Sequence, residues 1–132
     1  MATYRGGCLC GAVRFEARGE PTRVGLCHCA DCRKATGGFA MPYGDWRIEE
    51  FSVEGTLATH EGRSFCPACG SRVGHLSPDH AEVILGTLDE APSPFRPTRE
   101  VWVIRREPWM APVEGAAQFD RDAPPDDTPP GA

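Results

Sequence analysis

Seven cysteines constrain the fold of this 132-residue chain more than any other feature of its sequence. They fall into three short blocks: Cys8 and Cys10, then Cys27, Cys29 and Cys32, then Cys66 and Cys69. An odd count argues against a full set of disulfide bonds, and a reducing cytosol would oppose them as well. Metal binding is the better interpretation, because thiolates are the ligands that zinc and other borderline or soft cations select.

The first and last blocks each form a two-sulfur clamp. Cys8 and Cys10 lie two residues apart, and side chains at i and i+2 of an extended segment point to the same side. The last block, Cys66-Pro67-Ala68-Cys69-Gly70, has the form of a zinc knuckle, in which the two-residue spacer places both sulfurs on one ion. Together the two clamps supply the four sulfurs that a closed structural zinc site needs.

The middle block is one ligand short of a closed site. Cys27, Cys29 and Cys32 have C-x-C-x-x-C spacing and can reach one ion together. A catalytic zinc commonly keeps three protein ligands and leaves the fourth position to water or substrate. We therefore predict two zinc ions per chain, a structural one on Cys8, Cys10, Cys66 and Cys69 and an open one on Cys27, Cys29 and Cys32.

Two alternatives to this assignment stay open at the level of sequence. A zinc ribbon could use Cys29, Cys32, Cys66 and Cys69, although the 33 residues between those pairs exceed the usual spacing of about 15–20. The middle site could also be closed by a local protein ligand, and both zincs would then be structural. The candidates for that ligand are Asp31, His60, His75 and His80. An iron–sulfur cluster is disfavoured because the bacterial run of four cysteines is absent.

Short strands and turns dominate the remaining pattern, and no long segment has the 3.6-residue period of a helix. The sequence predicts strands over residues 13–17, 24–26, 39–43, 48–54, 83–85 and 101–104, one helical turn over 30–35 and a turn at 44–45. His28, which points away from its cysteine neighbours, is expected to pack or to form a hydrogen bond rather than to bind the metal. Phe39, Met41, Tyr43 and Trp46 either line a substrate pocket or belong to the core, whereas Trp102 and Trp109 are expected in the core.

Composition limits the organisation and the partners of the chain. Residues 1–111 are expected to form one domain, and the acidic, Pro-rich residues 112–132 a disordered tail that carries −4 of the net charge of −5. Without a basic stripe, nucleic acid is a poor partner. The longest apolar runs are far shorter than the roughly 20 residues of a membrane-spanning helix, and residues 1–7 have no signal-peptide pattern, so a cytoplasmic location is expected.

Several motifs resemble the glutathione-dependent formaldehyde-activating enzyme (Gfa-like) family, to which centromere protein V also belongs. They are Gly7-Cys8-Leu9-Cys10-Gly11, the stretch from Cys27 to Lys34, Phe65-Cys66-Pro67-Ala68-Cys69-Gly70-Ser71, and Gly86-Thr87-Leu88-Asp89. The resemblance covers about residues 4–110. It implies a mostly β, Mss4-like fold with a structural zinc on Cys8, Cys10, Cys66 and Cys69 and a catalytic zinc on Cys27, Cys29 and Cys32.

For such a protein the resemblance implies a carbon–sulfur lyase that acts on glutathione or another thiol adduct. Arg33 and Lys34 are candidates to contact the carboxylates of the substrate. One residue departs from the family pattern, because Glu100 stands where family members usually carry a histidine before the closing Trp. The alternative is a non-catalytic, zinc-stabilised module that binds a protein partner, since a fold does not fix a function.

Overall fold

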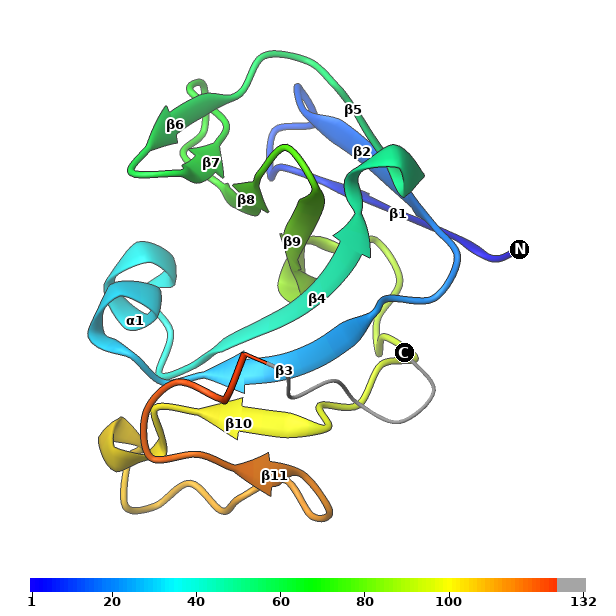
Figure 1. Ribbon diagram of the computed structural model, residues 1–132. Coiled ribbons are helices and arrows are strands. Elements are labelled where there is room, and N and C mark those ends of the chain that lie inside the picture. Colours follow the sequence, from blue (N-terminus) through cyan, green and yellow to red (C-terminus); the bar gives the residue numbers. More distant parts are fainter. Residues whose placement is uncertain (126–132) are drawn as a thin grey trace.

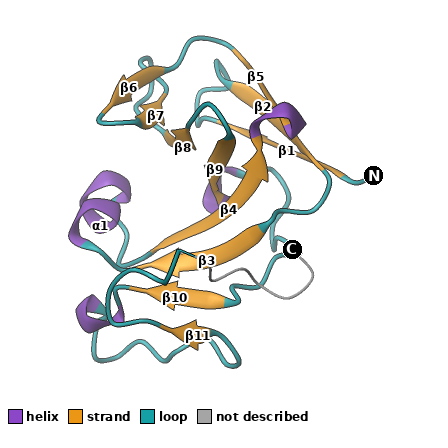
Figure 2. Ribbon diagram, in the orientation of Figure 1, coloured by secondary structure: helices purple, strands orange, loops and turns teal. Residues whose placement is uncertain are grey.

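The computed structural model describes residues 1–125 and consists mainly of β-strands (Figures 1 and 2). The strands are β1 (Thr3–Gly7), β2 (Arg14–Arg18), β3 (Arg23–Cys27), β4 (Met41–Arg47), β5 (Phe51–Glu54), β6 (Ala58–His60), β7 (Arg63–Phe65), β8 (Arg72–Leu76), β9 (His80–Ile84), β10 (Arg99–Val101) and β11 (Ala117–Gln118). Within these residues one α-helix, α1 (Ala30–Thr36), and three 3₁₀ turns, η1 (Ile48–Glu50), η2 (Leu85–Thr87) and η3 (Val103–Arg105), complete the fold. The prediction of a mostly β fold with little helix is confirmed.

The strands form two sheets. A three-stranded sheet has the order β1-β2-β5, and an eight-stranded sheet has the order β11-β10-β3-β4-β9-β8-β7-β6. Pairing is antiparallel except at β10, which runs parallel to both β3 and β11. This order places β3 between β10 and β4, so that Cys27 at the end of β3 lies beside Met41 of β4 and Val101 of β10.

The main core lies where the two sheets meet. The predicted alternation in residues 13–17 is present in β2, where Phe15 and Ala17 are buried and Arg14 is exposed. The buried set is Val13, Phe15, Ala17, Val24, Trp46, Phe51, Val73, Ala81, Val83 and Leu85, together with Cys8 and Cys66. A second buried cluster contains Cys27, Cys32, Met41, Tyr43 and Val101. Two of the three middle cysteines thus belong to their own small core.

The turn expected at residues 44–45 is absent, because β4 continues unbroken through both residues. A Cβ atom on Gly44 would lie 2.9 Å from a ring atom of Trp46 and 3.1 Å from Leu85. The glycine therefore allows two buried side chains to pack against the strand rather than reversing the chain.

The segment after residue 111 also differs from expectation. Residues 112–125 have a defined path, in which β11 pairs with β10 and Phe119 packs against the second buried cluster. Hydrogen bonds from the backbone N–H groups of Trp102 and Val103 to the carbonyls of Arg121 and Phe119 hold the segment further. Residues 112–125 therefore do not form the expected disordered tail, because backbone pairing outweighs their polar composition. The rest of the expected tail, residues 126–132, lies outside the described part of the chain.

Trp109 was expected in the core but lies on the surface with 68% of its area exposed. It packs edge to face against Phe39, which is also exposed, with ring centroids 5.0 Å apart. Trp102 is half-buried against the second cluster. Within residues 1–125, no helix is long and apolar enough to span a membrane.

Candidate metal centre

Four cysteines from two distant loops converge on one point. Cys8 and Cys10 follow β1, Cys66 and Cys69 follow β7, and their four Sγ atoms all lie within 4.8 Å of one another. The Sγ atoms of Cys8 and Cys10 are 3.6 Å apart, and those of Cys10 and Cys66 are 3.8 Å apart. The edge of a zinc–sulfur tetrahedron with 2.3 Å bonds is about 3.8 Å, so the arrangement fits a closed zinc site.

Local hydrogen bonds preform this four-sulfur cluster. The backbone N–H of Val13 donates to the Sγ atom of Cys8 at 3.2 Å, and the N–H of Leu9 donates to the Ser71 hydroxyl at 2.9 Å. Gly70 closes the knuckle with a positive φ of 81°, a conformation that glycine adopts without strain. The Leu9–Ser71 bond ties the first clamp to the second, across 62 positions of sequence.

The middle cysteines form a separate three-sulfur cluster. Cys27 ends β3, Cys29 caps the N-terminus of α1, and Cys32 lies in the first turn, where its N–H donates to the Sγ atom of Cys29 at 3.3 Å. Gly37 ends the short helix in the left-handed conformation. The alternative zinc ribbon is not formed, because Cys29 and Cys32 group with Cys27 rather than with Cys66 and Cys69.

No fourth ligand joins the three-sulfur cluster from residues 1–125. In that range no histidine, cysteine, aspartate or glutamate ligand atom completes the group. Asp31, the nearest candidate in sequence, is 79% exposed and lies 3.9 Å from Arg63. His80 instead contacts Ser77 and Asp79. Two sites of different character therefore result, one with four sulfurs and one with three.

Each cluster contains a thiol that loses its proton easily. A hydrogen bond from Cys32 lowers the pKa of Cys27 to about 6, and the same contact raises the pKa of Cys32. In the other cluster, a hydrogen bond with the Ser71 hydroxyl lowers the pKa of Cys69 to about 5. Both clusters thus offer a thiolate at neutral pH, which is the form that binds a metal ion.

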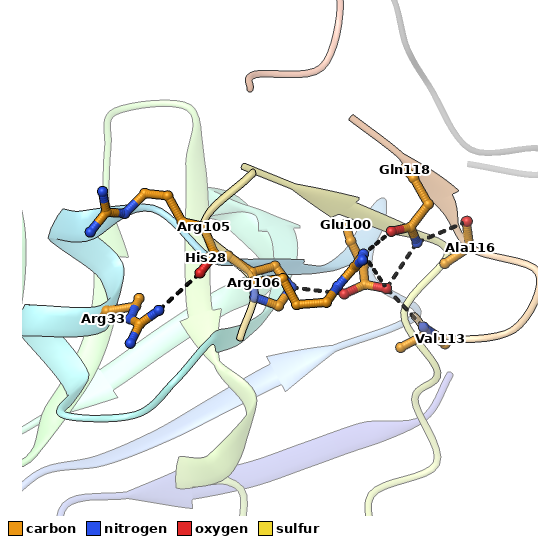
Figure 3. A network of polar contacts seen from close by, with 8 residues as sticks. All are labelled: His28, Arg33, Glu100, Arg105, Arg106, Val113, Ala116 and Gln118. Atoms are coloured by element: carbon orange, nitrogen blue, oxygen red, sulfur yellow. Dashed lines mark hydrogen bonds and ion pairs between the residues drawn. The ribbon is translucent and has the colours of Figure 1, made fainter. Parts of the chain in front are cut away.

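His28, which lies between Cys27 and Cys29 in the sequence, forms a buried pair with Glu100 (Figure 3). The Nε2 atom of His28 lies 2.8 Å from Oε1 of Glu100, and the two side chains are 0% and 1% exposed. The prediction that His28 forms a hydrogen bond rather than binding metal agrees with this contact. In the sequence Glu100 stands out only as a departure from the family pattern, and no local signal pairs it with His28, because 72 positions separate the two residues.

Glu100 also binds the C-terminal segment. Its Oε2 atom accepts hydrogen bonds from the Val113 N–H and the Gln118 side-chain amide, both at 2.8 Å, and Arg106 lies 3.6 Å away (Figure 3). Burial alone would raise the pKa of Glu100, but the hydrogen bonds from Gln118, His28 and Val113 and the charge of Arg106 together hold it below its usual value. The carboxylate is therefore ionised at neutral pH.

The two cations of the middle block have different environments. Arg33 donates one hydrogen bond to the Arg105 carbonyl at 2.9 Å (Figure 3) and another to the Glu107 carboxylate at 2.7 Å. Lys34 is exposed. Of the four residues considered as a pocket wall, Met41 and Tyr43 pack with the cluster cysteines, Trp46 belongs to the main core, and Phe39 is exposed.

Comparison with known proteins finds a matching family model and a related protein. The family model described as "Glutathione-dependent formaldehyde-activating enzyme" matches residues 3–105. A protein of Halomonas elongata, whose provisional name is glutathione-dependent formaldehyde-activating enzyme, is 27% identical over 130 residues, which cover 86% of this chain and 82% of that protein.

A solved structure supports the same relationship. The crystal structure of a Rhodobacter sphaeroides protein matches with a TM-score of 0.53 and 25% identity, and the match covers 68% of this chain and 91% of that one. Because the family model spans well over half of the sequence, this chain belongs to the glutathione-dependent formaldehyde-activating enzyme family.

Proposed function

We propose that this protein is a zinc-dependent carbon–sulfur lyase that acts on glutathione or a related thiol adduct, in the manner of an S-hydroxymethylglutathione synthase. Family membership and the name of the Halomonas elongata relative support the substrate class. The observation that carries the proposal is the three-sulfur cluster of Cys27, Cys29 and Cys32, which no ligand atom from residues 1–125 completes. The four-sulfur cluster would hold a second, structural zinc.

The chemistry follows from an open thiolate site. A zinc ion held by three cysteines would lower the pKa of an incoming thiol and so supply a thiolate at neutral pH. In the forward reaction the glutathione sulfur forms a bond to the formaldehyde carbon, the C=O π bond breaks, and the thiol proton ends on the new hydroxyl. The reverse reaction cleaves the same carbon–sulfur bond.

The residues of the chain have distinct parts in this proposal. Cys27, Cys29 and Cys32 hold the site, while the buried His28–Glu100 pair fixes the loop that carries Cys27 and Cys29. Three thiolates give a zinc site a net charge of −1, so neighbouring cations favour the entry of a fourth thiolate. Because free thiols are required, the proposal includes a reducing, cytoplasmic setting.

A second candidate function is a non-catalytic zinc module that binds a protein partner. The exposed aromatic pair of Phe39 and Trp109 favours it, because exposed aromatic residues are frequent in protein interfaces. Such a module would need no open metal position.

Exchange NMR with ¹³C-formaldehyde and glutathione tests the enzyme proposal. Zinc-loaded protein should accelerate exchange between free formaldehyde and S-hydroxymethylglutathione, and Cys29→Ser should abolish the acceleration. The matched control is Ser52→Ala, a change at an exposed residue of β5 far from the cluster in sequence. Equal exchange with and without the wild-type protein would reject the lyase and favour the binding module.

A further inference from the structure

A small cavity lies against the three-sulfur cluster. It measures about 30 Å³, and its lining includes Cys32, Met41, Arg63, Arg72 and Glu82. A neighbouring cavity of about 200 Å³ shares Arg63 and Arg72 in its lining and extends past Lys34. The two cavities share Arg63 and Arg72, so cations of α1, β7 and β8 lie next to the cavity that Cys32 lines; the lining of the larger cavity also includes Asp31 and Glu61.

Arg72 has an unused buried donor at this cavity. Its Nη1 atom is buried and donates no hydrogen bond to any group in residues 1–125. The guanidinium is held over the ring of Phe65, 4.9 Å from the centroid, and Phe65 lies opposite Arg72 in the pairing of β7 with β8. A buried cationic donor without an acceptor is costly, so the arrangement suits a ligand that supplies an oxygen.

Arg63 is only loosely engaged. Its Nη2 atom lies 3.9 Å from the Asp31 carboxylate, which is 79% exposed and therefore well solvated. Arg63 and Arg72 come from the paired strands β7 and β8 and line the same two cavities. Two guanidinium groups so placed favour a carboxylate, which each can bind through two parallel N–H groups.

Arg33 is less suited to bind a carboxylate of the ligand. Its guanidinium already donates to the Arg105 carbonyl and the Glu107 carboxylate. It lines a different cavity, of about 380 Å³, whose lining includes Phe39 and Arg105 but none of the three cluster cysteines. Lys34 borders both this cavity and the one lined by Arg63 and Arg72.

Glu82 is the acidic group at the inner cavity. Burial raises the pKa of Glu82 to about 7, and the charges of Asp45 and Cys27 raise it to a smaller extent. The charges of His80 and Arg63 act in the opposite direction. Near neutral pH it therefore carries only part of a negative charge. The positive charges of Arg63 and Arg72 exceed this partial negative charge, so the inner cavity keeps a positive character.

We propose that Arg63 and Arg72 form a carboxylate-binding subsite for the thiol substrate, with Lys34 at its outer end. The ligand class is a small thiol that bears a carboxylate, such as a peptide or amino-acid thiol. The inference rests on the proposed function in one respect, namely that the substrate sulfur goes to the cluster of Cys27, Cys29 and Cys32.

Calorimetry with two probes tests the subsite independently of thiol binding. The probes are S-methylglutathione, which has carboxylates but no free thiol, and its dimethyl ester, with zinc-loaded protein of verified metal content. The ester should bind the wild-type protein about tenfold more weakly, because charge-assisted hydrogen bonds are lost. Arg72→Gln and Arg63→Gln should each weaken binding of the acid by a similar factor and leave ester binding unchanged.

Two further variants act as controls. Arg47→Gln removes an exposed charge on β4, and Arg33→Gln removes the cation already paired with Glu107; neither should alter binding of the acid by more than about twofold, since their contacts lie elsewhere. Equal binding of acid and ester, or a loss with Arg33→Gln but not with Arg63→Gln or Arg72→Gln, would overturn the subsite. The comparison of acid with ester needs no variant and so holds even if Arg72→Gln folds poorly.

A second readout separates failure of the subsite from failure of the proposed function. The thiol 2-mercaptoethanol, which has no carboxylate, should change the charge-transfer absorption of the cobalt-substituted protein if thiols enter the cluster. A spectral change combined with equal binding of acid and ester rejects the subsite and keeps the function. Arginine-dependent binding of the acid without any spectral change rejects thiol entry and keeps the subsite.

Discussion

The Nε2 atom of His28 lies 2.8 Å from Oε1 of Glu100, and neither side chain has more than 1% of its area exposed. Because an ionised carboxylate accepts a hydrogen bond, this contact places a proton on Nε2 of the imidazole. His28 lies between two cluster cysteines, so the pair joins the loop of Cys27 and Cys29 to β10. Through Val113 and Gln118, the same carboxylate joins β10 to the C-terminal segment.

Replacement of Glu100 should destabilise the protein. Glu100→Gln removes the charge while keeping the shape of the side chain. The buried donors that now contact the carboxylate would then lack a charged acceptor. We expect the free energy of unfolding to fall by about 2–4 kcal/mol, as measured by urea denaturation. Glu54→Gln, an exposed change on β5, is the control and should have an effect below about 0.5 kcal/mol.

The stability difference between the wild-type protein and Glu100→Gln should depend on pH. The pKa of Glu100 is lowered in the folded state, so its contribution is complete above the unfolded value of about 4.3 and is lost as the pH falls through the folded value. We expect a constant difference above about pH 5 that shrinks in more acidic solution. Denaturation at a series of pH values measures this, and a difference that grows on acidification would contradict the assignment.

The C-terminal segment should contribute to stability through Gln118. The side-chain amide of Gln118 donates to Glu100, and its oxygen accepts a contact from Arg106. Gln118→Ala should reduce the free energy of unfolding by about 1–3 kcal/mol, because a buried carboxylate loses a donor. Glu114→Ala, an exposed change in the same segment, is the matched control, and equal effects of the two variants would argue against the contact.

The two clusters should respond differently to loss of one cysteine. Cys29→Ala is expected to release one of two zinc ions while far-UV circular dichroism stays nearly unchanged. Cys69→Ala should unfold the domain, because the four-sulfur cluster links the loop after β1 to the loop after β7, and binding of a structural zinc is coupled to folding. Atomic absorption gives the zinc content. Loss of folding in both variants would indicate that both clusters are structural.

Part of the fold could be predicted from local sequence alone. The alternation of Phe15 and Ala17 with charged residues identified β2, and the spacing of Cys27, Cys29 and Cys32 identified a cluster that α1 indeed closes. Both signals act within a few residues, where side-chain direction follows directly from the backbone period. The turn expected at Gly44 was wrong because Leu85, which is distant in sequence, packs closely against the strand there together with Trp46 and leaves no room for a side chain.

The sequence by itself determined that the chain has seven thiols in three short blocks with the spacing of metal ligands, and that its strands are short. Only the tertiary structure decided which blocks meet, that Glu100 is the partner of His28, that residues 112–125 join the sheet, and that Arg63 and Arg72 border the cluster cavity. The His28–Glu100 contact joins residues 72 positions apart, and the paired residues of β10 and β11 are 18 positions apart. Such contacts depend on strand order and on the burial of charge, which no local spacing encodes.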